Sequence, residues 1–271
     1  MSHKNELTVG IVGLGAVGKT LVKRLDDGIF GLKLSAVSVR DVKKTAGILQ
    51  GLKGDIKILG LTELAQAVDV VVECAPAELL AEIAEPVLRA GKTLIVLSVG
   101  ALLDRMDLID LAREYGAQII VPTGALLGLD AVTAAAEGNI RSVKMITRKP
   151  VRGLVGAPFL VANKINIDDI TSPIQIFSGT AREAAKGFPA NLNVVVALAL
   201  AGIGPDQTQL EIWADPALTR NTHVIEVDSD AASFSMSIQN IPTENPKTGR
   251  ITAQSVLAAL RKLRSPIRVG T

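Results

Sequence analysis

Hydrophobic positions in the first half of the chain form short apolar runs separated by segments of helical periodicity. The apolar runs are typical of strands that are buried on both faces of a parallel sheet. They predict strands over Thr8–Val12, Leu32–Val39, Asp55–Leu59, Asp69–Cys74, Thr93–Val99 and Ala117–Pro122. The segments between them predict helices over Ala16–Asp26, Thr62–Ala67, Leu79–Ala90 and Leu103–Tyr115. This alternation predicts an α/β fold, a Rossmann-type doubly wound parallel sheet.

The pattern changes after Thr123-Gly124-Ala125, where strands begin to outnumber helices. Strands are predicted over Val143–Arg148, Ile174–Ser178, Gln209–Ala214, His223–Asp228 and Ser233–Gln239. Helices are predicted over Thr180–Lys186 and Leu192–Ala201, loops over Pro150–Pro173, and a connector over Ile241–Arg250. Runs of strands of this kind indicate a second, α+β domain.

An amphipathic helix is predicted at the end of the chain, over Ile251–Arg264. We expect residues 1–124 to form a dinucleotide-binding domain, with a C-terminal helix within 250–271 packing back on it. Residues 125–249 would then form the second domain.

A glycine fingerprint lies between the first strand and the first helix. Gly13, Gly15 and Gly18 form a G-x-G-x-x-G pattern around Ala16 and Val17. In dinucleotide-binding domains the first glycine allows a tight turn, the second admits the diphosphate, and the third lets the helix pack closely on the strand. The diphosphate then lies against the free amides at the start of the helix. The alternative is an ordinary glycine-rich turn in a domain that binds no nucleotide.

Two further positions bear on a coenzyme. Arg40 and Asp41 follow the second strand, where an acidic residue binds the adenosine ribose of NAD and an arginine favours the extra phosphate of NADP. The sequence therefore leaves NAD and NADP both open. Cys74 and Ala75 follow the fourth strand, at the edge where open α/β sheets bind ligands. Because no histidine lies near Cys74 in the sequence, we interpret its thiol as a buried small side chain rather than a nucleophile.

Composition excludes several classes of protein. The net charge of +2 and an aromatic content of 3% argue against a nucleic-acid-binding surface. A single cysteine excludes an internal disulfide and a thiolate zinc cluster, and no metal is expected. We see no signal peptide, and the longest apolar stretch, Val194–Ala201, is too short to span a bilayer. A cytoplasmic protein without a membrane or nucleic-acid partner is expected.

Candidate chemistry in the second half starts with a histidine. His223 follows Asn221 and Thr222 in a polar cluster ahead of an apolar strand, while His3, the other histidine, lies in the polar N-terminal tail. An imidazole suits general acid–base work. The alternative is a strand-edge histidine that only bonds nearby backbone.

A second group of candidates surrounds the predicted helix after Ser178. Arg182 and Lys186 share one helix face and could hold substrate carboxylates, although solvated surface charges are the commoner outcome. Asn191, near the start of the next helix, could cap that helix or reach a carboxamide such as that of nicotinamide.

At this point the chain resembles the L-aspartate dehydrogenase family. The resemblance covers essentially the whole chain and is carried by GLGAVG, ECAPAELL, VPTGALLGLDA, SGTAREAAKGFPANLNVVVALALAGIG and EIWADPALTRNTH. It implies that His223 is catalytic, and that Ala125 and an asparagine of the ANLN segment, Asn191 or Asn193, contact the dinucleotide. It also implies a homodimer formed through the second domain.

The resemblance implies oxidation of L-aspartate to iminosuccinate with NAD or NADP, and the reverse reductive amination. Iminosuccinate would hydrolyse to oxaloacetate and ammonia or enter quinolinate and NAD synthesis. Candidates to bind the substrate carboxylates are Arg182, Lys186, Asn221 and Thr222. The alternatives are a reductase of the homoserine dehydrogenase or dihydrodipicolinate reductase type, and a non-catalytic sensor of NAD(P). A dihydrodipicolinate reductase carries a histidine-rich catalytic loop, and this chain has too few histidines to supply one.

Overall fold

A computed structural model describes residues 6–188, 192–242 and 249–270. The chain divides into two compact units. The first comprises the residues up to Pro122 together with Ala253–Arg268, and the second comprises Thr123–Thr252 and the residues from Val269 onward.

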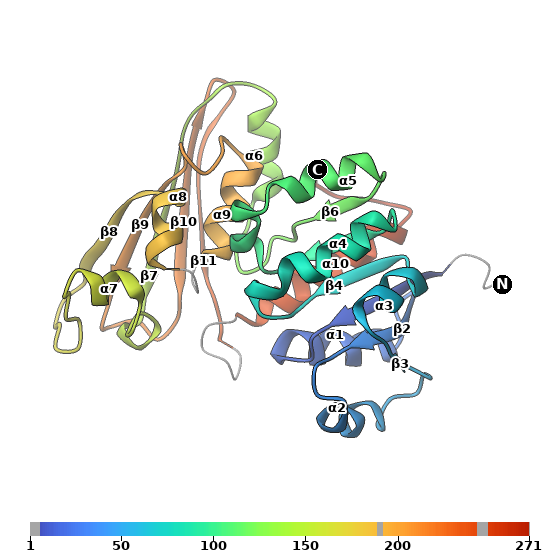
Figure 1. Ribbon diagram of the computed structural model, residues 1–271. Coiled ribbons are helices and arrows are strands. Elements are labelled where there is room, and N and C mark those ends of the chain that lie inside the picture. Colours follow the sequence, from blue (N-terminus) through green and yellow to red (C-terminus); the bar gives the residue numbers. More distant parts are fainter. Residues whose placement is uncertain (1–5, 189–191, 243–248, 271) are drawn as a thin grey trace. The chain divides into compact units, whose positions relative to one another are not determined.

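The first unit is built on a six-stranded sheet with the order β3-β2-β1-β4-β5-β6. Every neighbouring pair of its strands is parallel. The strands are β1 (Leu7–Val12), β2 (Leu32–Ser38), β3 (Lys57–Ile58), β4 (Val70–Glu73), β5 (Thr93–Val96) and β6 (Gln118–Ile120) (Figure 1). This order, in which the chain returns to the centre after β3, is that of the Rossmann fold and confirms the predicted fold class.

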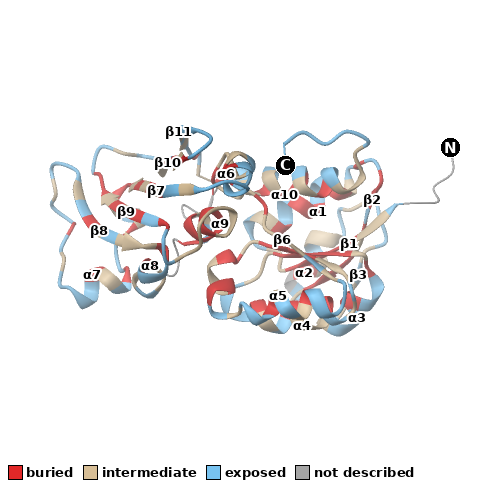
Figure 2. Cartoon of the chain, turned by 90° about the horizontal axis from the view of Figure 1, so that it is seen from above, coloured by how far each residue is buried: buried red, intermediate tan, exposed pale blue. Residues whose placement is uncertain are grey.

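Helices cover both faces of this sheet. They are α1 (Ala16–Asp26), α2 (Val42–Leu49), α3 (Leu61–Ala67), α4 (Leu80–Arg89), α5 (Asp107–Glu114) and α10 (Arg250–Arg264), with 3-10 turns over Ala77–Leu79 and Val99–Asp104. Figure 2 shows α1 and α10 on one face and α3, α4 and α5 on the other.

Two details of this unit differ from the prediction. The helix expected from Leu103 to Tyr115 begins only at Asp107, because Arg105 donates hydrogen bonds to Asp107 and Glu85 and so holds the chain in a turn. The helix α2 was not predicted, because a segment of eight residues gives few positions from which to read a period.

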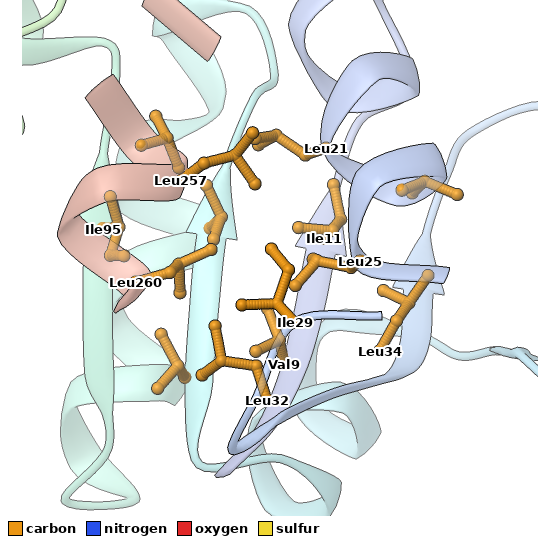
Figure 3. Close-up of a cluster of buried hydrophobic side chains, with 14 of the residues drawn as sticks. Val9, Ile11, Leu21, Leu25, Ile29, Leu32, Leu34, Ile95, Leu257 and Leu260 are labelled. Atoms are coloured by element: carbon orange, nitrogen blue, oxygen red, sulfur yellow. The ribbon is translucent and has the colours of Figure 1, made fainter. Parts of the chain in front are cut away.

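The C-terminal helix shares the core of the first unit. Val256, Leu257 and Leu260 of α10 are buried in one cluster with Leu21 of α1 and Ile95 of β5 (Figure 3). Since these residues come from opposite ends of the chain, the last helix completes the hydrophobic core that carries the glycine turn.

The second unit is built on a five-stranded mixed sheet with the order β11-β10-β7-β9-β8. The β7–β9 pair is parallel and the other pairs are antiparallel. The strands are β7 (Ile140–Lys149), β8 (Ile174–Thr180), β9 (Gln209–Ala214), β10 (Thr222–Ser229) and β11 (Ser233–Gln239). A mixed sheet with helices confirms the predicted α+β class.

Four helices accompany this sheet within the described residues: α6 (Leu129–Ala136), α7 (Pro158–Ala162), α8 (Ala181–Gly187) and α9 (Asn193–Ala201). The loops predicted over Pro150–Pro173 are interrupted by a 3-10 turn and by the single-turn α7, which is too short to show a period. The helix α6 was also missed, because only Val132 and Ala135 of its alanine-rich sequence are buried. In the part of the chain that the structure describes, no helix is long and apolar enough to cross a membrane.

Candidate active site

The glycine turn after β1 has the close contacts that its sequence predicts. Gly13 has a φ of +87°, and a Cβ there would lie 2.7 Å from the backbone oxygen of Cys74. A Cβ on Gly18 would lie 2.1 Å from the oxygen of Gly13. Both positions therefore require glycine, because any side chain would force α1 and β4 away from the turn.

The space beside Gly15 is open, in contrast to that beside the other two glycines. A Cβ on Gly15 would meet no described atom within 4 Å, and Gly15 caps α1 without a side-chain hydrogen bond. The first backbone bond of the helix runs from Lys19 N to Gly15 O, at 3.0 Å, so the amides of Ala16, Val17 and Gly18 precede the intrahelical ladder. Free amides at a helix start beside open space fit a diphosphate.

The predicted coenzyme residues Cys74 and Ala75 lie beside this turn. Cys74 N donates to Val12 O at 2.8 Å, which places the end of β4 next to the end of β1. These two strands flank the point where the strand order reverses, which is where sheets of this type bind ligands.

A buried carboxylate that sequence analysis missed organises the same edge. Glu73 is fully buried and accepts four hydrogen bonds, from Ala75 N (2.9 Å), Leu97 N (3.0 Å), Ser98 N (2.8 Å) and Ser98 Oγ (3.0 Å). Burial raises the pKa of Glu73, and these hydrogen bonds oppose the rise. The side chain thus ties the segments that leave β4 and β5 to each other. The signal in the sequence was a glutamate at the end of an apolar strand.

Cys74 follows Glu73 in the chain and packs against the hydrophobic core of the first unit. Burial raises the pKa of Cys74 well above its usual range, and the charge of Glu73 raises it further. A thiol held in its neutral form is a poor nucleophile, which agrees with the interpretation of Cys74 as a packing residue.

Arg40 and Asp41 follow β2 at the same edge of the sheet and are exposed. The backbone oxygen of Asp41 accepts hydrogen bonds from Thr45 N (3.2 Å) and Thr45 Oγ1 (2.8 Å), at the start of α2. Both side chains are accessible to a ribose or to its phosphate, and both coenzymes fit this end of β2.

In the second unit, His223 occupies a core position. It lies on β10 directly opposite Thr147 of β7, is 2% exposed, and its Nδ1 lies 3.1 Å from Thr147 Oγ1. Burial lowers the pKa of His223 from 6.5 to about 3, with a further contribution from the positive charge of Lys149. The imidazole is therefore neutral at neutral pH.

Lys149 was not among the predicted site residues. The buried positions along β7 are Val143, Met145, Thr147 and Lys149, so the lysine shares the face of the sheet that carries His223. Lys149 is only 5% exposed. The sequence concealed it, because Lys149 is followed by Pro150 and looks like an ordinary charged strand end.

Thr222, which precedes His223 in the sequence, does not share a face of the sheet with it. Thr222 pairs with Arg148 across the ladder, and strand alternation puts it on the face opposite to His223. Arg148 stacks on the ring of Trp213 on that other face, at 4.9 Å. The geometry therefore gives no support to a joint role of Thr222 and His223 at one substrate.

Asn221 is linked to Ala125 through a residue that the sequence did not single out. Asn240 is buried, and its backbone N donates to Asn221 O at 2.9 Å. Its side-chain Nδ2 donates to Ala125 O at 2.8 Å. Asn240 thus holds together two segments that carry predicted site residues.

The remaining candidates lie elsewhere in the second unit. Arg182 is paired through both Nε and Nη2 with the carboxylate of Asp206, and it is exposed. Lys186 lines a surface pocket with Phe159 and Phe177. Asn193 is the first residue of α9 and is exposed, whereas Asn191 and His3 lie outside the described residues. Two strands, β7 and β9, lie between β10 and β8, the strand that leads into the helix of Arg182 and Lys186, so the sheet does not bring these two side chains to His223.

Family models match both halves of the chain. Residues 13–122 match the family model described as homoserine dehydrogenase, NAD binding domain, and residues 130–263 match the model described as aspartate dehydrogenase, C-terminal. The first match begins at Gly13, and the second contains His223 and Lys149.

Full-length relatives extend the match to both units. The chain is 60% identical to an L-aspartate dehydrogenase of Bradyrhizobium diazoefficiens, over 98% of this chain and 95% of the relative. It is also 60% identical to L-aspartate dehydrogenase 3 of Bordetella bronchiseptica, over the full length of both. The crystal structure of aspartate dehydrogenase from Thermotoga maritima, at 26% identity, covers 98% of this chain and 100% of its own with a TM-score of 0.74. The chain belongs to the L-aspartate dehydrogenase family.

Proposed function

We propose that this protein oxidises L-aspartate to iminosuccinate with NAD or NADP and catalyses the reverse reductive amination. The observation that carries the proposal is 60% identity to L-aspartate dehydrogenases over nearly the whole chain. In this reaction the α-carbon loses a hydride and the α-ammonium group loses a proton, which leaves a protonated imine. Water then converts iminosuccinate to oxaloacetate and ammonia, unless the imine is passed on to quinolinate and NAD synthesis.

The first unit would hold the coenzyme. When bound, NAD or NADP supplies the nicotinamide that accepts the hydride. The amides of Ala16, Val17 and Gly18 would donate to the diphosphate, and Gly13 and Gly15 would admit it. Arg40 and Asp41 lie at the end of β2, where the adenosine ribose is bound in this fold. Cys74 and Ala75 border the same site through their backbone.

The second unit would carry the proton chemistry at His223. Its Nδ1 contacts the hydroxyl of Thr147, which leaves Nε2 as the ring nitrogen for the substrate. A neutral imidazole with its proton on Nδ1, donated to Thr147 Oγ1, takes a proton on Nε2 from the α-ammonium group of aspartate. The resemblance to the family adds Ala125 and Asn191 or Asn193 as contacts of the coenzyme.

The competing functions receive less support. A homoserine dehydrogenase would share the coenzyme-binding half, and the match over residues 13–122 carries that description. The match over the second half, which contains His223, carries the description of aspartate dehydrogenase instead. A non-catalytic sensor would have no use for a buried histidine beside a buried lysine.

The assembly and the location are part of the proposal. We infer a homodimer that forms through the second unit, as the family resemblance implies, and a cytoplasmic enzyme whose only substrates are small molecules. Size-exclusion chromatography with light scattering measures the mass directly, and a monomer at micromolar concentration would contradict the dimer.

The test of the reaction is the absorbance of the reduced nicotinamide. Purified protein is incubated with L-aspartate and NAD or NADP at alkaline pH, and then with oxaloacetate, ammonia and reduced coenzyme. We expect turnover in both directions, and none with L-glutamate or L-homoserine as the amino donor. Coenzyme binding without turnover in either direction would refute the proposal and favour a sensor.

A further inference from the structure

The buried face of the second sheet becomes polar at one end. Along β7, Val143 and Met145 continue the hydrophobic core, but the next two buried positions are Thr147 and Lys149. On the neighbouring strand β10, His223 is followed at the buried positions by Ile225, Val227 and, at the far end of the strand, Ser229. His223 therefore lies at the same end of the face as Thr147 and Lys149.

A buried lysine lies at that end of the face. Removing an ammonium from water costs several kcal/mol unless charges or hydrogen bonds compensate for it. The positive charge of Lys149 also disfavours protonation of His223, because it would repel the positive charge of an imidazolium. A negatively charged ligand beside these two side chains would attract the ammonium and would favour protonation of the imidazole.

The substrate of the proposed reaction is such a ligand, because aspartate and iminosuccinate carry two carboxylates. A binding site for a dicarboxylate needs buried cationic or amide donors. Among the cations predicted for this task, Arg182 is engaged by Asp206 and Lys186 lines a separate pocket.

We propose that Lys149 is a substrate-binding residue that takes one carboxylate of the dicarboxylate and thereby determines specificity for aspartate. The inference rests on the proposed function and on the common face that Lys149, Thr147 and His223 share. The bound carboxylate then lies beside the imidazole, offsets the charge of the lysine, and makes His223 a stronger base when substrate is present than when it is absent.

Replacement of the lysine by a neutral side chain of similar length tests this role. Lys149→Met is expected to raise the KM for L-aspartate by about 30-fold or more, since a carboxylate that loses its buried cationic partner costs at least 2 kcal/mol. The Kd for the coenzyme stays within about twofold of the wild type. Lys149→Arg keeps the charge and is expected to recover part of the affinity for aspartate.

Lys144→Met is the matched control. Lys144 lies on the same strand but points to the other face, where its Nζ pairs with Glu211 at 2.7 Å. The same substitution there leaves the KM for aspartate unchanged. A KM for Lys149→Met within about threefold of the wild type would overturn the proposal.

A second readout separates a role at the substrate from a structural one. The chain has only two histidines, so the ring resonances of His223 are identified in NMR spectra by their loss in a His223→Asn variant. In Lys149→Met the titration midpoint of His223 rises, because a neighbouring positive charge has been removed. In the wild type, addition of succinate, a dicarboxylate that cannot be oxidised at an amine, raises the same midpoint, and in Lys149→Met it does not.

Asp215 is buried and its backbone N donates to Lys149 O at 2.9 Å. A lysine that served only to balance this carboxylate would lower stability when replaced and would leave the succinate response intact, which would contradict the proposal. If the wild type fails to oxidise aspartate, the proposed function fails. The response of His223 to succinate still decides whether Lys149 binds a carboxylate.

Discussion

His223 and Thr147 face each other across two antiparallel strands, whose middle positions on the same face are filled by the apolar Val143, Met145, Ile225 and Val227. A histidine with so little exposure remains neutral through most of the acidic range, and its pKa of about 3 follows from burial and from Lys149. Burial keeps the imidazole unprotonated and ready to accept a proton. Its basicity then depends on the charge that the substrate brings.

Replacement of His223 by asparagine tests its role in turnover. His223→Asn keeps an amide near Thr147 but removes the group that titrates, so kcat is expected to fall by about 10² to 10⁴. Steady-state kinetics measure the loss of turnover. Titration followed by fluorescence measures the affinity for the coenzyme, which should not change.

Glu226→Gln is the control for that experiment. Glu226 lies on the same strand, is exposed, and points away from the buried face. We expect wild-type kinetics from it. A His223→Asn variant that kept a kcat near that of the wild type would exclude the imidazole from the reaction.

At the scale of the elements, the carboxyl ends of β1, β4 and β5 are held together by backbone and one side chain. Gly13 contacts the end of β4 where a Cβ would collide, and Glu73 binds the segments that leave β4 and β5. Cys74 and Ala75 are therefore positioned by Glu73, which itself is not expected to touch the coenzyme.

Glu73→Gln tests this positioning role. The glutamine amide places N–H groups against backbone donors that the carboxylate accepted, and a buried donor without an acceptor costs about 1–3 kcal/mol. We expect a lower melting temperature and a Kd for the coenzyme that rises about tenfold, measured by calorimetry and fluorescence titration.

The control here is Glu82→Gln on the exposed side of α4, which should alter neither quantity. A coenzyme Kd for Glu73→Gln equal to that of the wild type would limit the carboxylate to a role in stability.

At the scale of the whole molecule, tryptophan fluorescence reports on the unfolding of only one of the two units. The single tryptophan, Trp213, lies on β9 in the second unit, so its fluorescence follows the unit that contains His223. The first unit closes its core with α10, from the far end of the chain.

The buried histidine makes the stability of the second unit depend on pH. The folded state has a pKa of about 3 and the unfolded state about 6.5, so below pH 6.5 the unfolded state binds a proton that the folded state does not. The stabilisation is complete above pH 6.5 and is lost as the pH falls toward 3. We expect the wild type to lose about 1.4 kcal/mol per pH unit relative to His223→Asn within this window.

Urea unfolding followed by tryptophan fluorescence at pH 7, 6 and 5 measures that difference. Other titrating groups are common to both proteins and cancel. A difference in unfolding free energy that stays constant from pH 7 to pH 5 would mean that the folded protein protonates His223 as readily as the unfolded chain.

Most of the architecture follows from local patterns. Short hydrophobic segments predicted the parallel strands, and the glycine spacing predicted the turn that Gly13 and Gly18 make, because strand burial and backbone sterics act over a few neighbouring residues. Short helices such as α2 and α7 escaped, since one or two turns carry too little periodicity.

The sequence by itself determined the two kinds of sheet, the glycine turn and the candidate His223, and its motifs identified the family. Tertiary structure alone decided which side chains share a face with that histidine. Strand alternation sent Thr222 to the opposite face, and the ladder between β7 and β10 brought in Thr147 and Lys149, which lie more than seventy residues away in the chain. The pairing of β4 with β5 likewise brought Ser98, which follows β5, to the carboxylate of Glu73. Such pairings depend on the register between strands that are distant in the sequence, and the spacing of residues within one strand does not predict that register.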